Sequence, residues 1–300
     1  MARRHRGTFG YLGNFTYHVP GAGGIFALLL WLLAGALVGN IIMLAMVKLL
    51  GEGVTECATI VSYVVMFIPP MLYSSSKSRV NSMNCKGYTL DSDKHIKPLG
   101  WAVAVPVVMA GTLALSYCSE QAGAWLPDMP EWLEEALGNL TQGALWLDFI
   151  CVSICAPIFE EWLCRGMVLR GLLCRKVSPV WAIIISGLFF ALIHMNPWQA
   201  IPAFLLGCLF GYVYYRTGSL KLTMLMHFTN NTFALILSNI DSIKEADTFQ
   251  EILPGTAYWT VFAACVIIVV LTVLAFRRIP VEGGNCNCDE VPSLFEERDA

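Results

Sequence analysis

The sequence predicts an all-α fold, in the form of a polytopic membrane protein with about eight transmembrane helices. Hydrophobic residues make up 56% of the 300 residues and charged residues only 14%, and the mean hydropathy is +0.61. This composition excludes an ordinary soluble domain. Apolar windows of about 20 residues, the length that crosses a bilayer as a helix, recur along the chain and leave no room for a large soluble domain. The formal net charge of −3 gives no indication of a nucleic-acid partner.

Eight apolar windows are expected to form the spans, and glycines, prolines or polar stretches separate them. In chain order they are residues 25–47, 54–73, 99–118, 144–163, 179–195, 198–215, 220–237 and 257–276. The first window is long enough to span and lacks a small-residue cleavage site, so it predicts a first span and not a signal peptide. The fourth window is expected to continue beyond the membrane as an amphipathic helix to about Lys176. The predicted layout is an N-terminal segment (1–24), a membrane domain (25–278) and a C-terminal tail (279–300).

The distribution of lysine and arginine predicts the orientation. With a cytoplasmic N-terminus, only Lys48 and Lys244 of the nineteen Lys and Arg residues fall on the outer side. The positive-inside rule therefore places both termini in the cytoplasm of a multi-pass cell-membrane protein. The outer segment 119–143 mixes tryptophans with acids and is expected to form a short amphipathic helix at the membrane interface, or a simple loop.

Small residues and cysteines add two minor expectations. Gly35-x-x-x-Gly39 and Gly207-x-x-x-Gly211 predict close approach of helices. The eleven cysteines mostly lie in apolar runs and do not form the pattern of a disulfide framework. Cys286 and Cys288 form a C-x-C near the tail that could bind metal, although a plain reduced tail is the simpler expectation.

Three polar stretches interrupt the apolar sequence, and they hold the candidate functional residues. Ionisable groups at membrane depth are costly and usually serve a pathway or chemistry. The candidates are Glu160, Glu161, Arg165, His194, His227 and Asn231. Glu161 and Arg165 are four residues apart and are expected to form a structural ion pair. Glu160 points about 100° away around the helix, so it is the better candidate for a carboxylate that faces a cavity.

Helix geometry indicates that these groups can meet. Glu160 and His194 are each about 25 Å from a turn near Val177, at 1.5 Å per residue. His227 and Asn231 lie one turn apart on one face of a later helix. They reach the same level if the charged hairpin between the fourth and fifth windows extends into the cytoplasm.

The residue types are those of a hydrolase. Glu160 can take a proton from water, with His194 orienting that water, and His227 with Asn231 can donate to a developing oxyanion. A zinc site that uses His194, His227 and a carboxylate is a second use of the same groups. Each stretch by itself also fits a structural role, as an ion pair, a backbone contact or a helix bridge. If the roles were only structural, all three polar stretches would have to meet at one level by coincidence. The chemical interpretation is therefore favoured.

At these residues the chain resembles the CPBP family, the CAAX prenyl endopeptidases of the Ras-converting type with their bacteriocin-processing relatives (also called the abortive-infection family). The family pattern E-E-x-x-x-R appears at residues 160–165, F-x-x-x-H at 190–194 and H-x-x-x-N at 227–231. The resemblance covers roughly 144–237, which is then the catalytic core. Cys164 stands where the family usually has an aromatic residue.

The resemblance implies an intramembrane endopeptidase, metallo- or glutamate-dependent, that acts on a membrane-associated or lipidated protein or peptide. It implies catalytic roles for Glu160, Glu161, His194, His227 and Asn231, and no certain cofactor beyond a possible zinc. Two alternatives stay open from the sequence. One is a non-catalytic membrane scaffold or bacteriocin-immunity factor on the same fold. The other is a proton-coupled transporter, against which stands the lack of an internal repeat.

Overall fold

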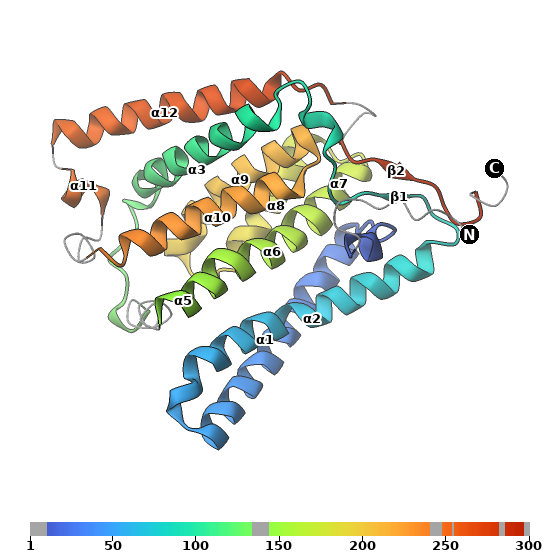
Figure 1. Ribbon diagram of the computed structural model, residues 1–300, viewed down its shortest axis with the longest axis horizontal. Coiled ribbons are helices and arrows are strands. Elements are labelled where there is room, and N and C mark those ends of the chain that lie inside the picture. The colour runs from blue at the N-terminus through green and yellow to red at the C-terminus, as the bar shows by residue number, and fades with distance from the viewer. Residues whose placement is uncertain (1–10, 134–143, 241–247, 254, 282–285, 297–300) are drawn as a thin grey trace.

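The computed structural model describes residues 11–133, 144–240, 248–253, 255–281 and 286–296. These residues form an all-α membrane-protein fold in which the helices run side by side (Figure 1). The one pair of strands in the described residues is very short, β1 (Gly87–Tyr88) against β2 (Glu290–Val291), antiparallel. The predicted fold class is therefore confirmed at the level of an all-α membrane protein.

The first two helices form a hairpin that projects from the rest of the bundle (Figure 1). It consists of α1 (Ala22–Leu50) and α2 (Thr55–Asn81). Gly35 and Gly39 of α1 face the backbone of α2, where a Cβ at Gly39 would lie 2.5 Å from the Ser62 carbonyl oxygen. The small residues thus allow the two backbones to touch, as the Gly-x-x-x-Gly spacing predicts.

One long helical rod carries the two candidate glutamates. It runs through α5 (Leu145–Asp148), α6 (Ala156–Glu161) and α7 (Arg170–Cys174), joined by π-helical segments at Phe149–Cys155 and Trp162–Leu169. The joining residues keep right-handed helical backbone angles, so the rod is continuous. Every residue of the second π-helical segment is buried. Such segments are rare and often occur at functional sites.

Three consecutive helices pack beside this rod. They are α8 (Pro179–Leu192), α9 (Pro197–Thr217) and α10 (Leu220–Leu237). The Asn196 side chain caps α9 and the Ser219 side chain caps α10, each by accepting a backbone N–H. Gly218 separates α9 from α10 with a φ of 68°, a left-handed conformation that glycine adopts without steric cost. This tight turn makes α9 and α10 neighbours.

The remaining long helices are α3 (Trp101–Gly123) and α12 (Thr256–Arg277), which pack on each other and on α9. Short elements complete the described fold: 3₁₀ turns at Leu12–Phe15, Glu52–Val54 and Lys94–Ile96, and α11 (Phe249–Ile252). The segment expected at the membrane interface is covered only in part. Residues 119–123 belong to α3 and 134–143 lie outside the described residues.

A helix occupies each of the eight apolar windows, but fewer meet the length and hydropathy of a membrane span. Among the described residues four do: Ala22–Leu50, Glu52–Asn81, Trp101–Gly123 and Thr256–Arg277. Pro179–Leu192 is a shorter apolar helix. The windows therefore predict the helices correctly, while the number of eight spans stays a prediction.

Arg165 and Arg170 lie in the part of the fourth helix that is expected to continue beyond the membrane as an amphipathic helix, and the structure corrects this expectation. Both side chains are fully buried within the protein. Arg170 instead donates to backbone carbonyls, among them His18 at 2.6 Å and Tyr88 at 2.8 Å. A guanidinium with five donors can satisfy several carbonyls at once, so burial beside the N-terminal segment replaces solvation.

Candidate functional site

Glu160 lies near the end of α6, and its two carboxylate oxygens have different surroundings. The Tyr63 hydroxyl of α2 donates to Oε1 at 2.6 Å. Oε2 is buried and accepts no hydrogen bond from the described residues. The side chain is 13% exposed. Oε1 is thus held in place by Tyr63, and Oε2 has no hydrogen-bond partner among the described residues.

Glu161 and Arg165 form the buried ion pair that their spacing predicts. Arg165 Nη1 donates to Glu161 Oε1 at 2.7 Å, and neither side chain is exposed. Arg165 also donates to the Gly207 carbonyl at 3.0 Å. Its guanidinium lies over the Phe190 ring at 4.6 Å, a cation–π contact. A buried ion pair is tolerated when such additional contacts satisfy it.

His227 of α10 reaches both glutamates. Its Nδ1 is 3.1 Å from Glu161 Oε1, and its Nε2 is 4.0 Å from Glu160 Oε2. Glu161 is paired with Arg165 and can only accept here, so Nδ1 carries the proton of this hydrogen bond. In neutral His227, Nε2 is then an acceptor, and it lies 4.0 Å from the Glu160 oxygen that accepts no hydrogen bond from the described residues.

His194 lies just beyond the end of α8, and it is partly exposed. Its Nδ1–H donates to the Phe190 carbonyl at 2.7 Å, which leaves Nε2 as an acceptor. Among the described residues, no carboxylate forms an ion pair with this histidine within 4.0 Å. The Phe190 ring meets the rings of both His194 and His227 edge-on, at 5.0 and 5.4 Å. Phe190 therefore contacts both histidines.

A cavity of about 190 Å³ brings His194, His227 and Asn231 together. It is lined by Phe190, His194, Gln199, Pro202, Ala203, Leu206, Phe210, His227, Asn230 and Asn231. The Asn231 amide donates to the Val152 carbonyl at 2.8 Å, which ties α10 to the first π-helical segment. Each primary amide has a second N–H. The cavity thus combines two imidazoles with amide donors from α9 and α10.

The histidine donors do not fit a zinc ion. Among the described residues, a zinc-type group of three His, Cys, Asp or Glu side chains, with ligand atoms within 4.8 Å of one another, occurs only at three cysteines elsewhere in the fold. His194, His227 and a carboxylate do not converge in this way.

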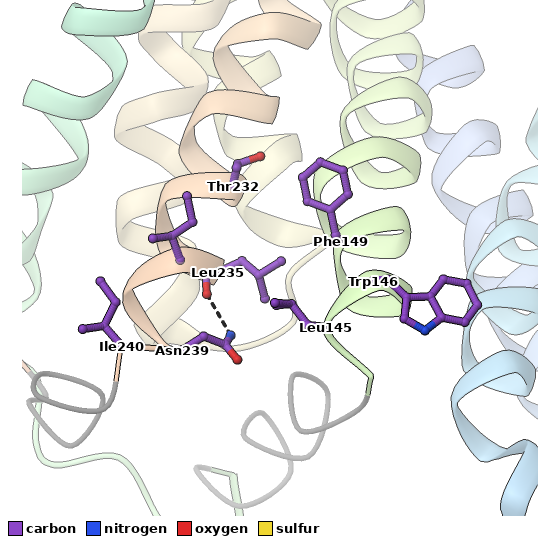
Figure 2. Close-up of a pocket in the computed structure, with 8 residues that line it drawn as sticks. Leu145, Trp146, Phe149, Thr232, Leu235, Asn239 and Ile240 are labelled. Carbon is purple, nitrogen blue, oxygen red and sulfur yellow. Dashed lines mark hydrogen bonds between the residues drawn. The ribbon is translucent and has the colours of Figure 1, made fainter.

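A second, larger cavity of about 730 Å³ lies between the beginning of α5 and the end of α10 (Figure 2). Its lining is almost entirely apolar and includes Leu145, Trp146, Phe149, Leu235 and Ile236. The Asn239 amide at its edge donates to the Leu235 carbonyl at 2.9 Å, the bond drawn in Figure 2. None of the described residues that line this cavity is titratable, whereas the smaller cavity is lined by two histidines.

Sequence reasoning missed Tyr63, Gln199 and Asn230. Tyr63 lies in the second apolar window, where a tyrosine is unremarkable in the sequence, and no spacing links it to Glu160. Gln199 and Asn230 each lie within a few residues of a predicted histidine. This closeness in the sequence was the only indication that they belong to the site. Arg165, by contrast, is recognisable from its spacing to Glu161.

Comparison with known proteins agrees with the motifs. The family model described as Rce1-like, type II CAAX prenyl endopeptidase, matches residues 142–233. No curated protein and no solved structure matches the chain. The match spans the rod with Glu160 and Glu161, α8, α9 and most of α10, and so includes all the candidate residues. Over residues 142–233, the match supports the resemblance of this membrane protein to the CPBP family of intramembrane proteases that the motifs indicate.

Proposed function

We propose that the protein is an intramembrane endopeptidase that hydrolyses a peptide bond of a membrane-associated or lipidated protein or peptide, with water activated by Glu160. The Rce1-like match supports protease activity of the CAAX type. The geometry around Glu160 supports the glutamate-dependent form of the reaction.

One observation carries this proposal: the 4.0 Å separation between Glu160 Oε2 and His227 Nε2. The distance is too long for a direct hydrogen bond and suits one water molecule that contacts both atoms. Both atoms are acceptors when Glu160 is ionised and His227 is neutral, so that water donates to each. A carboxylate and an imidazole that share a water are well placed to remove its proton.

The adjacent cavity supplies the remaining groups. After Glu160 takes the proton, the hydroxide attacks the substrate carbonyl, and the resulting oxyanion needs donors. The amides of Asn230 and Asn231 line the cavity next to His227 and can provide them. Glu160 then returns the proton to the leaving amine. In this proposal His227 orients the water, which the resemblance implies for His194, and His194 lines the opposite part of the cavity.

Glu161 acts as a positioning residue in this scheme. It accepts hydrogen bonds from both Arg165 and His227, which sets the tautomer and orientation of the imidazole. Such outer contacts are typical of catalytic histidines. Arg165 holds the Glu161 carboxylate in place through their 2.7 Å ion pair.

The proposed orientation places both termini in the cytoplasm. The described N-terminal segment, the tail, the end of α7 and the turn between α9 and α10 meet at one end of the bundle (Figure 1). Cationic residues gather at this end, among them Arg175, Arg216 and Lys221. The positive-inside rule makes this the cytoplasmic end.

The test is cleavage by purified protein in detergent or proteoliposomes. We expect Glu160→Gln, which keeps the shape of the side chain but cannot accept the proton, to abolish hydrolysis of membrane-protein peptides, with and without a lipid chain. Glu52→Gln, on an exposed carboxylate at the turn between α1 and α2, is the matched control and should retain activity.

Two outcomes would overturn the proposal. Undiminished cleavage by Glu160→Gln would remove Glu160 from the reaction. A cellular phenotype that is lost on gene deletion but fully restored by Glu160→Gln would instead favour a non-catalytic scaffold or immunity factor on this fold.

A further inference from the structure

Three cysteines from distant parts of the sequence meet at the end of α7. They are Cys174, the last residue of that helix, and Cys286 and Cys288 of the C-terminal tail. Their sulfur atoms all lie within 4.8 Å of one another, and Cys174 Sγ is 3.6 Å from Cys286 Sγ. Two thiolates on one tetrahedral zinc ion lie about 3.8 Å apart, given Zn–S bonds of about 2.3 Å. The spacing therefore suits a shared metal ion.

The tail is held against the bundle independently of the cysteines. β2 pairs with β1, and the Asn287 amide, between the two tail cysteines, donates to the carbonyls of Arg216 and Pro280 at 2.6 and 2.9 Å. Lys86 and Lys94 form ion pairs with Glu290 and Asp289. These contacts hold Cys286 and Cys288 beside Cys174 without a disulfide. A site held in advance costs less ordering when an ion binds.

A second observation favours the thiolate form of these cysteines, which is the form that binds metal. Arg170, one turn before Cys174, is fully buried, and all its hydrogen bonds within the described residues go to backbone carbonyls. No carboxylate of the described residues forms an ion pair with it. Buried charges are normally paired. Thiolates one turn away would provide the missing negative charge.

We propose that Cys174, Cys286 and Cys288 bind a soft metal ion of the Zn²⁺ or Cu⁺ class, which fastens the C-terminal tail to the end of the glutamate-bearing rod. Thiolates favour these ions over harder ones. On binding, the three thiols release their protons to solvent, and three sulfur–metal bonds form with no change in oxidation state. With Zn²⁺, a fourth position is left for water or another small ligand. The site is separate from the proposed catalytic residues and does not depend on their function.

The test is metal analysis of the full-length protein, purified under reducing conditions and loaded with Zn²⁺ or, anaerobically, with Cu⁺. We expect about one tightly bound ion per chain. Each of Cys174→Ser, Cys286→Ser and Cys288→Ser should lower the bound metal at least tenfold. Cys85→Ser, on an exposed cysteine, and Glu160→Gln should leave it unchanged. Loading with Co²⁺ should give a thiolate-to-cobalt absorption band that the three cluster variants lack.

Limited proteolysis provides a readout that does not depend on metal retention during purification. Chelation should make the tail after residue 281 more sensitive to protease in the wild type, and leave the cluster variants unchanged. The proposal is overturned if the loaded wild type holds no metal, or if the metal survives all three cysteine substitutions. Loss of metal in His227→Ala together with retention in the cysteine variants would place the ion at the histidines and also overturn it.

Discussion

The imidazole Nδ1 of His227 lies 3.1 Å from Glu161 Oε1, the same oxygen that accepts from Arg165 at 2.7 Å. This shared oxygen links α10 to the glutamate-bearing rod, and it leaves His227 Nε2 directed at Glu160. The two adjacent glutamates therefore have different tasks in the proposed reaction. Glu160 meets the water, and Glu161 orients the imidazole that shares it.

The first prediction concerns Glu161. Glu161→Gln should reduce cleavage by about 10–100-fold, as expected when an outer contact of a catalytic histidine is lost. It should also lower stability by roughly 3–5 kcal/mol, because Arg165 is left as an unpaired buried charge. Thermal unfolding in detergent and peptide cleavage measure the two effects separately.

A double substitution separates orientation from folding. Glu161→Gln with Arg165→Met removes both charges, so stability should recover relative to Glu161→Gln while cleavage stays low. Recovery of activity together with stability would show that Glu161 matters only for folding.

The second prediction concerns Tyr63, whose hydroxyl donates to Glu160 Oε1. Tyr63→Phe should lower kcat by roughly tenfold, because it releases the carboxylate from its oriented position. Stability should change by only about 1 kcal/mol, the usual contribution of one hydrogen bond. The effect should appear in kcat and not in KM.

Tyr73→Phe is the matched control, since Tyr73 is on the same helix and packs against the His18 ring. Equal kcat values for the Tyr63 and Tyr73 variants would contradict the orienting role of Tyr63.

Local patterns predicted what lies within one helix or at one turn. The Glu161–Arg165 pair is four residues apart, and the break at Gly218 marks a real turn between α9 and α10. The contacts that build the site are of another kind. Tyr63 is 97 residues from Glu160, and His227 is 66 residues from Glu161. Such contacts depend on how the helices pack, and hydrophobic periodicity does not encode that.

The same limit applies to the cysteines and the buried arginines. Cys174 and Cys286 are 112 residues apart, so the C-x-C alone gave no sign of a third thiol. Arg170 looked like a solvated charge because its carbonyl partners in the N-terminal segment cannot be anticipated from spacing. The three motifs are recognisable in the sequence because each one spans no more than six residues.

The third prediction tests the close packing of α1 on α2. Gly39→Ala should destabilise the protein by about 1–3 kcal/mol, because the added methyl group meets the Ser62 carbonyl and forces the helices apart. Gly23→Ala lies in the same helix with no atom within 4 Å of its Cβ, so it should be neutral or slightly stabilising. Thermal unfolding of the two variants checks the packing directly, and similar losses of stability in both would argue against it.

The fourth prediction concerns pH and His18, which lies in the N-terminal segment before α1. Burial, followed by the charges of Arg170, Lys77 and Arg175, lowers the pKa of His18 from 6.5 to about 4. Below pH 6.5 the unfolded chain binds a proton at this residue and the folded protein does not, so stability should fall between pH 6.5 and about 4. His18→Phe keeps a ring against Tyr73 and removes the titration, so its unfolding temperature should fall less over this interval. The difference between the two proteins isolates the contribution of His18. If the unfolding temperatures of the two proteins fall in parallel with pH, protonation of His18 does not destabilise the folded protein and the prediction is wrong.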